Sequence, residues 1–211
     1  MQEQLTIVCI EGNIGSGKST LLTGLQIHGF KVLLEPIDEW DTYRNNDGSL
    51  LELLYKDPRR YAFTFQMMCL WTRAKALKEA IDECIRTGTR VLIVERSLLT
   101  SSKVFVRVMV SNGVISPLEF RLYHELHESL QHGLENLRYN TIYINADPSV
   151  CLNRISSRSR NGERGITYEY IHQLHRRHEE WLNYVNPYEI DGNADSETVL
   201  IQALNYLRAL V

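Results

Sequence analysis

A glycine-rich segment near the N-terminus has the residue types and spacing of a phosphate-binding loop. Residues Gly12 to Ser19 fit the pattern G-x-x-x-x-G-K-[ST] at every fixed position. The glycines let the backbone curl so that its N–H groups point at phosphate oxygens, and the helix expected to follow adds its positive N-terminal end. Lys18 would reach the β- and γ-phosphates, and the Ser19 hydroxyl would bind Mg²⁺. We therefore predict a nucleoside triphosphate site formed by Gly12, Asn13, Ile14, Gly15, Ser16, Gly17, Lys18, Ser19 and Thr20.

Two carboxylates directly follow apolar runs that read as strands. Glu35 follows residues 32–34, and Glu95 follows residues 92–94 and precedes Arg96. In open α/β sheets ligands bind beyond the carboxyl ends of the strands, so both acids should share an edge with the phosphate loop. Phosphoryl transfer needs an oriented acceptor hydroxyl, a metal between phosphates and nearby positive charge. Glu35 could take the acceptor proton, Glu95 could hold Mg²⁺ directly or through water, and Arg96 could contact phosphate or fix Glu35.

The elements that position these residues alternate along the chain. Nearly continuous apolar runs predict strands buried on both faces, as in a parallel sheet covered by helices. Helix start signals include Asp57-Pro58 and the pair Ser116-Pro117 with Glu119, and Gly88 is a stop signal. The expected strands are 5–10, 31–34, 91–94, 141–145 and a weak fifth at 188–191; the expected helices include 58–86, 117–132, 167–185 and 196–210.

Composition limits the kinds of protein that this chain can be. Its 211 residues carry 23 Lys and Arg against 26 Asp and Glu, a formal net charge of −3, which gives no support for a nucleic-acid partner. No run approaches the roughly 20 apolar residues of a membrane span. The four cysteines are far apart and predict buried thiols. No linker or leader segment stands out, so we expect a single domain over residues 1–211 and a cytoplasmic location.

Together these residues resemble the deoxyribonucleoside kinases, the family of deoxycytidine, deoxyguanosine and mitochondrial thymidine kinases and the insect multisubstrate enzyme. The resemblance runs from about Thr6 to Trp181. It implies a P-loop kinase fold with a parallel five-stranded sheet flanked by helices, and transfer of the γ-phosphoryl of ATP-Mg to the 5′-hydroxyl of a deoxyribonucleoside. The motifs that carry it are Gly12–Thr20, Glu35-Pro36-x-x-x-Trp40, residues 50–58, Phe65-Gln66, Glu95-Arg96-Ser97, and Leu174-His175-x-x-His178-Glu179-x-Trp181.

The resemblance also implies roles for single residues. Glu35 resembles the general base, assisted by Arg96 and Lys18, and Ser19 and Glu95 resemble the metal-associated pair. An amide offers a donor and an acceptor to a base edge, and an aromatic plane suits a flat base. Without the resemblance, core packing would be the preferred interpretation of the aromatic residues. The implied nucleoside contacts are Trp40 as a wall, Gln66 on the base edge, and Tyr55 with Glu163 on the sugar 3′-hydroxyl.

The chain departs from the family pattern at the residues that read the base. Arg73 lies two helical turns after Gln66 and matches the arginine of the deoxycytidine and deoxyguanosine branch. That branch pairs the arginine with an aspartate, whereas this chain has Ser101. Without a carboxylate partner, Arg73 could contact a base carbonyl or swing out to solvent. Its length would crowd the 5-methyl group of thymidine, which favours deoxycytidine or purine deoxynucleosides.

An arginine-rich segment, about residues 154–166, is expected to act as a lid. Arg154 and Arg158 lie four residues apart on one helix face, and guanidinium forks suit phosphate oxygens. By resemblance, Arg154, Arg158 and Arg160 close over the ATP phosphates, and Glu163 in the same segment would couple closure to sugar binding. The alternatives are a solvated basic loop or an RNA-contacting patch, and the acidic total does not favour RNA.

Two other functions and one assembly state stay open at this point. A nucleoside monophosphate kinase of the thymidylate kinase type shares the phosphate loop and lid, but an Asp-Arg motif would be expected in place of Glu95-Arg96-Ser97. A non-catalytic nucleotide-binding subunit would not need Glu35. Relatives also suggest a homodimer through helices 58–86 and 117–132, whose apolar stripes are Tyr61, Phe65, Met68, Leu77 and Ile81, and Leu118, Leu122, Leu126 and Leu130.

Overall fold

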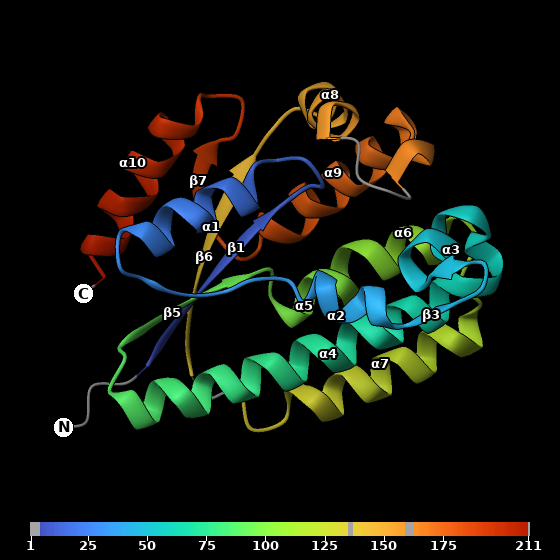
Figure 1. Cartoon of the computed structure of the whole chain (residues 1–211), viewed down its shortest axis with the longest axis horizontal. Helices are drawn as coiled ribbons and strands as arrows, with labels where there is room; N and C mark the ends of the chain where they lie inside the picture. The colour runs from blue at the N-terminus through green and yellow to red at the C-terminus, as the bar shows by residue number, and fades with distance from the viewer. Residues whose placement is uncertain (1–4, 135–136, 159–162, 211) are drawn as a thin grey trace.

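A parallel sheet of five strands forms the centre of the protein. The computed structural model describes residues 5–134, 137–158 and 163–210. The strand order is β2-β5-β1-β6-β7, with every neighbouring pair parallel (Figure 1). This confirms the predicted sheet, including its weak fifth strand. The strands are β1 Thr6–Gly12, β2 Lys31–Leu33, β5 Val91–Glu95, β6 Arg138–Asn145 and β7 Tyr188–Asp191.

Alternating side chains of the central strand fill two separate cores. Val8 and Ile10 pack towards α1 (Lys18–Ile27) and α10 (Ser196–Arg208). Ile7 and Cys9 pack on the opposite face, towards α4 (Pro58–Thr87). Because β1 is buried on both faces, its sequence is nearly continuously apolar, as expected for a parallel sheet. Figure 1 shows α1 and α10 on one side of the sheet and α4 on the other.

The long helices begin and end where their capping residues predict. The Asp57 side chain accepts a hydrogen bond from Arg60 N at the start of α4, and Gly88 adopts φ +71° directly after its end. Ser116 and Glu119 form a capping box at α7 (Pro117–Gln131). The positive φ of Gly88 costs little because glycine has no Cβ, so the helix stops there.

Several shorter elements complete the fold, and helical periodicity did not predict them. β3 and β4 form a short antiparallel hairpin around residues 45–48. A π-helical turn separates α5 from α6, and such bulges often occur at functional sites. These elements are α2 Ile37–Thr42, β3 Arg44–Asn45, β4 Gly48–Ser49, α3 Leu50–Lys56, α5 Leu98–Thr100, the π-turn Ser101–Phe105, α6 Val106–Ser111 and the 3₁₀ turn Glu163–Gly165. Two other helices were expected: α9 Tyr168–Leu182 lies within the predicted helix 167–185, and α8 Pro148–Arg158 carries Arg154 and Arg158.

The two apolar stripes that we expected at a subunit interface behave differently. Most of the α4 stripe lies inside the chain, because Phe65, Met68, Leu77 and Ile81 are buried. On α7, in contrast, Leu118 is 74% exposed and its neighbours one and two turns on, Leu122 and Leu126, are 47% and 38% exposed. Of these two stripes, that of α4 therefore belongs mostly to the core, and that of α7 is exposed at Leu118, Leu122 and Leu126.

All four cysteines, Cys9, Cys69, Cys84 and Cys151, are free and buried, which confirms the prediction from their spacing. Among the described residues, no helix is both long and apolar enough to span a bilayer.

Candidate active site

A cavity of about 440 Å³ lies at the sheet edge where the strands end. Its wall includes the phosphate loop after β1, Glu35 after β2 and Glu95 at the end of β5. Arg154 of α8 and Gly192 after β7 also line it. The parallel topology therefore brings residues from five separate parts of the chain to one edge, as the strand-end argument predicted.

The phosphate loop curls tightly around the start of α1. Gly15 and Gly17 adopt φ values of +79° and +105°, and a Cβ on Gly12 would lie 2.8 Å from the Ile144 carbonyl oxygen. The buried Lys18 Nζ donates to the carbonyl oxygens of Gly12 at 3.1 Å and Asn13 at 2.7 Å. Burial, and the nearby guanidinium of Arg96, lower the pKa of Lys18 to about 7.

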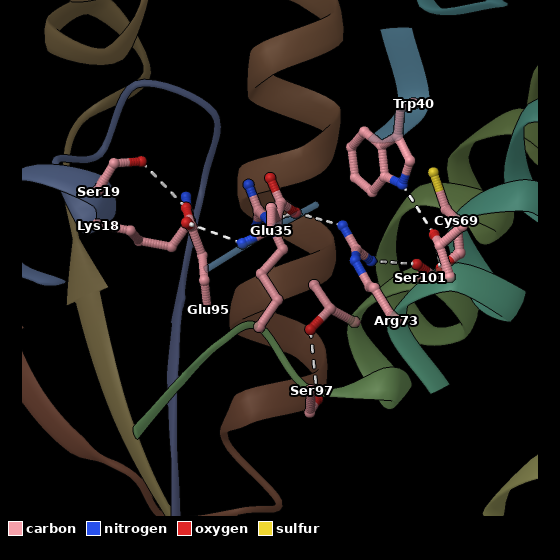
Figure 2. Close-up of polar contacts among 12 residues, drawn as sticks. Lys18, Ser19, Glu35, Trp40, Cys69, Arg73, Glu95, Ser97 and Ser101 are labelled. Atoms are coloured by element: carbon pink, nitrogen blue, oxygen red, sulfur yellow. Dashed lines mark hydrogen bonds and ion pairs between the residues drawn. The ribbon is translucent and has the colours of Figure 1, made fainter. Parts of the chain in front are cut away.

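Ser19 and Glu95 form an oxygen-rich pair beside this loop. Ser19 Oγ donates to Glu95 Oε1 at 3.1 Å, and the other oxygen of Glu95 accepts from Glu35 N at 3.4 Å. Figure 2 shows Ser19 and Lys18 on one side of Glu95 and Glu35 on the other. Hydroxyl and carboxylate oxygens are the ligands that Mg²⁺ prefers, so this donor set fits the predicted metal.

Glu35 is held by two arginines. Its Oε1 accepts hydrogen bonds from Arg73 Nη2 and from Arg96 Nε, the latter at 3.0 Å. Burial alone would raise the pKa of Glu35, but Arg73, Arg96 and Lys18 together lower it to about 2. The Glu35 carboxylate is therefore ionised at neutral pH and faces the cavity as a hydrogen-bond acceptor.

Arg96 connects Glu35 to the phosphate loop. While its Nε binds Glu35, its Nη1 donates to the Gly12 carbonyl oxygen at 2.6 Å, and its guanidinium carbon lies 5.1 Å from the ring centre of Phe105. The backbone of Arg96 has φ +65°, a left-handed conformation that is uncommon outside glycine. The Arg96 guanidinium thus links Glu35, which follows β2, to Gly12 at the end of β1.

Arg73 does not swing out to solvent, so that alternative is wrong. Its side chain is only 10% exposed, it forms an ion pair with Glu35, and its Nη1 donates to Ser101 Oγ at 2.6 Å. The guanidinium carbon lies 5.3 Å from the Trp40 ring centre. Since Ser101 is neutral, the carboxylate that balances Arg73 is Glu35, which sequence reasoning did not anticipate.

The residues expected to bind a nucleoside also line this cavity. Trp40 Nε1 donates to Thr72 Oγ1 at 2.8 Å, which fixes the indole, and Phe65 meets its edge at 5.7 Å between ring centres. Gln66 is 3% exposed, and its Oε1 has no hydrogen-bond partner. A buried carbonyl without a donor is costly, so Gln66 is prepared to accept a hydrogen bond from a ligand. Trp40, Tyr55, Gln66, Arg73 and Ser101 all line the same cavity.

The arginine-rich segment is partly engaged with the protein itself. Arg154 Nη1 donates to the carbonyl oxygens of Ser16 at 3.2 Å and Gly192 at 2.9 Å. Arg158 forms a bidentate pair with Glu163, at 2.8 and 2.6 Å, and both residues line the cavity with Tyr55. The predicted phosphate ligand Arg158 is thus joined to the predicted sugar ligand Glu163. Arg160 lies outside the described residues.

Sequence reasoning missed several residues at or behind the site. Phe105 and Tyr170 line the cavity, and the sequence does not distinguish them from core aromatics. Glu11 is fully buried, does not line the cavity, and accepts hydrogen bonds from Ser97 N and Thr100 Oγ1. The sequence does contain a signal for Glu11, because an acid inside an otherwise apolar, buried strand needs polar partners.

A parallel sheet with a phosphate loop after its first strand, acids after two neighbouring strands and guanidinium groups around them defines a P-loop kinase. Comparison with known proteins supports a narrower assignment, because the family model for deoxynucleoside kinases matches residues 8–206. The chain therefore belongs to the deoxynucleoside kinase family, as its motifs suggested.

Individual relatives agree with this assignment. A probable deoxycytidine kinase of fowlpox virus is 35% identical over 195 residues, covering 89% of this chain and 79% of that protein. Human deoxycytidine kinase is 31% identical over 193 residues, with 83% and 74% covered. A putative kinase protein of Invertebrate iridescent virus 3 is 33% identical over 205 residues, with 97% of each chain covered. The chain is an enzyme that phosphorylates deoxynucleosides, with a nucleotide as the phosphate donor.

Proposed function

We propose that the enzyme transfers the γ-phosphoryl group of ATP, bound with Mg²⁺, to the 5′-hydroxyl of a deoxyribonucleoside. The observation that carries this proposal is the ionised, partly buried Glu35, which lines the same cavity as the phosphate loop and Gln66. Glu35 accepts the proton of the 5′-hydroxyl as the hydroxyl oxygen attacks the γ-phosphorus. The bond from that phosphorus to the oxygen that bridges it to the β-phosphate breaks, and ADP is released.

The protein groups around the transferred phosphoryl supply positive charge and orientation. Lys18, which now donates to the loop carbonyls, turns to the β- and γ-phosphates, and its pKa rises next to that negative charge. Arg96 holds Glu35 against the loop, and Arg154 lies beside Ser16, where it can reach a phosphate oxygen. Ser19 and Glu95 hold Mg²⁺, whose chemistry is to neutralise charge on the phosphates.

The acceptor is positioned by the part of the cavity wall that holds Gln66 and Trp40. The unpartnered Gln66 Oε1 accepts from an exocyclic amine on the base edge, and Trp40 forms the aromatic wall. Tyr55 and Glu163 hold the sugar 3′-hydroxyl, with Arg158 fixing the carboxylate. Deoxycytidine, deoxyadenosine and deoxyguanosine carry such amines and thymidine does not, so we propose the first three as preferred acceptors. The names of the deoxycytidine kinase relatives support testing deoxycytidine first.

We propose one kinase domain over residues 1–211, with a lid at about 154–166, in a cytoplasmic enzyme without nucleic-acid or membrane partners. The exposed row of Leu118, Leu122 and Leu126 on α7 supports a homodimer that covers this row. The two alternative functions are disfavoured, because the family match is to kinases that act on nucleosides and because Glu35, Lys18 and Arg96 are all present.

The test is steady-state phosphorylation by the purified enzyme with Mg-ATP. The acceptors are the four common deoxynucleosides and, in parallel, their monophosphates. Glu35→Gln should lower kcat by about 10²–10⁴-fold, the usual contribution of a general base, and should retain nucleoside binding. The control is Asp38→Asn, which changes an exposed acid three residues away. Turnover of monophosphates only, or an active Glu35→Gln variant, would contradict the proposal.

A further inference from the structure

The turn that carries Arg96 is unusual and needs support. Arg96 adopts φ +65° between the end of β5 and the start of α5. For any residue other than glycine this left-handed conformation is unfavourable, because Cβ lies too close to the following carbonyl oxygen. Such conformations persist only where the surrounding structure imposes them.

Three consecutive residues of β1 hold the turn. The Ile10 carbonyl oxygen accepts from Arg96 N at 3.1 Å, and the Gly12 carbonyl oxygen accepts from Arg96 Nη1 at 2.6 Å. Between them, Glu11 Oε1 accepts from Ser97 N at 2.8 Å. Glu11 is the only one of the three that holds the turn through its side chain, so it is the one that mutation can change without altering the backbone.

Glu11 also binds the beginning of the next helix. Thr100 Oγ1 lies 2.8 Å from Oε1 and 2.7 Å from Oε2 of the carboxylate, and both Glu11 and Thr100 are fully buried. The carboxylate therefore fastens the peptide after Arg96 and the first turn of α5 to the central strand. Figure 2 shows Ser97, on the chain that leaves the sheet, below Glu35 and Arg73.

Stability alone does not explain an acid at this position. Burying a carboxylate is costly, and well-packed apolar groups in its place are often neutral or stabilising. Burial raises the pKa of Glu11, although Ser97, Thr100 and Arg96 oppose this. Glu11 is also absent from the cavity wall, so it cannot touch a ligand there. What it contacts is the turn that orients Arg96.

We propose that Glu11 is a positioning residue for phosphoryl transfer. It holds the Arg96–Ser97 turn in its left-handed form, and Arg96 held in this way keeps Glu35 beside the phosphate loop. This inference rests on the proposed role of Glu35. Glu11 orients the catalytic groups, whereas Gln66 and Trp40 bind the nucleoside.

The test compares two replacements of Glu11. Glu11→Gln keeps an acceptor for Ser97 N and gains an amide that can donate to Thr100 Oγ1, so kcat should stay within about threefold of the parent. Glu11→Leu removes both bonds at similar volume, so kcat should fall by about 10- to 100-fold, as expected when a catalytic group is misplaced by an ångström. The dissociation constant of the nucleoside should stay within about twofold in both variants, since the base subsite is unchanged.

A control and a second variant keep the result interpretable. Cys9→Ala changes a buried residue of β1 that lies two positions before Glu11, on the same face of the strand. This variant should lower the melting temperature without changing kcat. If Glu11→Leu does not fold, Thr100→Val decides: a kcat reduced by about three- to tenfold, with unchanged nucleoside affinity, supports the proposal. An unchanged kcat in the folded Leu variant, or in Thr100→Val when the Leu variant does not fold, overturns it. Equal losses in Gln and Leu also overturn it.

The parallel variant Glu35→Gln separates this inference from the proposed function. A large loss of kcat in Glu35→Gln with none in folded Glu11→Leu refutes only the role of Glu11. An active Glu35→Gln variant refutes the general base itself, whatever Glu11 does.

Discussion

Replacing Arg73 with methionine should cost the free enzyme less stability than replacing Glu35 with glutamine, although the two residues share an ion pair. The side chains are only 10% and 13% exposed. Glu35→Gln leaves Arg73 and Arg96 without their carboxylate, and removal of one partner from a buried pair costs about 3–5 kcal/mol. Arg73→Met leaves Glu35 paired with Arg96 Nε at 3.0 Å. We therefore expect Arg73→Met to lower the free energy of unfolding by about 1–2 kcal/mol, the scale of one or two hydrogen bonds.

Urea unfolding at pH 7 without ligand measures both costs, and the double variant completes a thermodynamic cycle. The coupling energy between Glu35 and Arg73 should be about 1–3 kcal/mol, because the residues are in direct contact. The matched control is the exposed i,i+4 pair Arg121–Glu125, whose atoms lie 3.4 Å apart and whose coupling should be at most about 0.5 kcal/mol. Equal costs for the two single variants, or an additive double variant, would refute the shared-carboxylate arrangement.

Three further predictions concern proton uptake on nucleotide binding, the contribution of Arg154 to that binding, and dimerisation. Because burial and Arg96 hold the pKa of Lys18 at about 7, the amine is mostly neutral at pH 8; a bound polyphosphate raises that pKa, so binding should take up protons. Calorimetry in two buffers of different ionisation enthalpy measures the uptake, and Lys18→Met should abolish it. Arg154→Ala should weaken nucleotide binding about tenfold, the scale of a lost charged hydrogen bond, with nucleoside titrations unchanged. Leu122→Glu, on the exposed α7 row, should shift sedimentation velocity profiles from dimer to monomer; a monomeric parent would contradict the proposed homodimer.

Much of the site was predictable because parallel strands end at one edge. The phosphate loop, Glu35 and Glu95 each follow an apolar run, so their meeting follows from the topology. Helix caps such as Asp57 and Gly88 were equally readable, because their chemistry is local. These predictions depend on short stretches of sequence and on one rule about sheets.

The partners of charged side chains were harder to predict. The sequence identified Arg73 and Ser101, but the choice of Glu35 as the carboxylate that balances Arg73 depends on three elements meeting in space. The bidentate pair of Arg158 with Glu163 is similar, because Arg158 belongs to α8 and Glu163 to the separate 3₁₀ turn. The π-turn at residues 101–105 has no periodic signal of its own. Long-range pairing, unlike capping, is not encoded locally.

The position of β1 has a consequence for how the enzyme is made. β1 is synthesised before the other strands, yet it pairs with β5 on one side and β6 on the other, so its partners are residues 91–95 and 138–145. Pairings so distant in sequence close slowly, and a growing chain leaves this apolar strand uncovered until both partners have emerged. The last residue of β1, Gly12, pairs with Ile144 at the base of the phosphate loop. The nucleotide site begins near the N-terminus but is completed late, so recovery of nucleotide binding during refolding reports closure of the whole sheet.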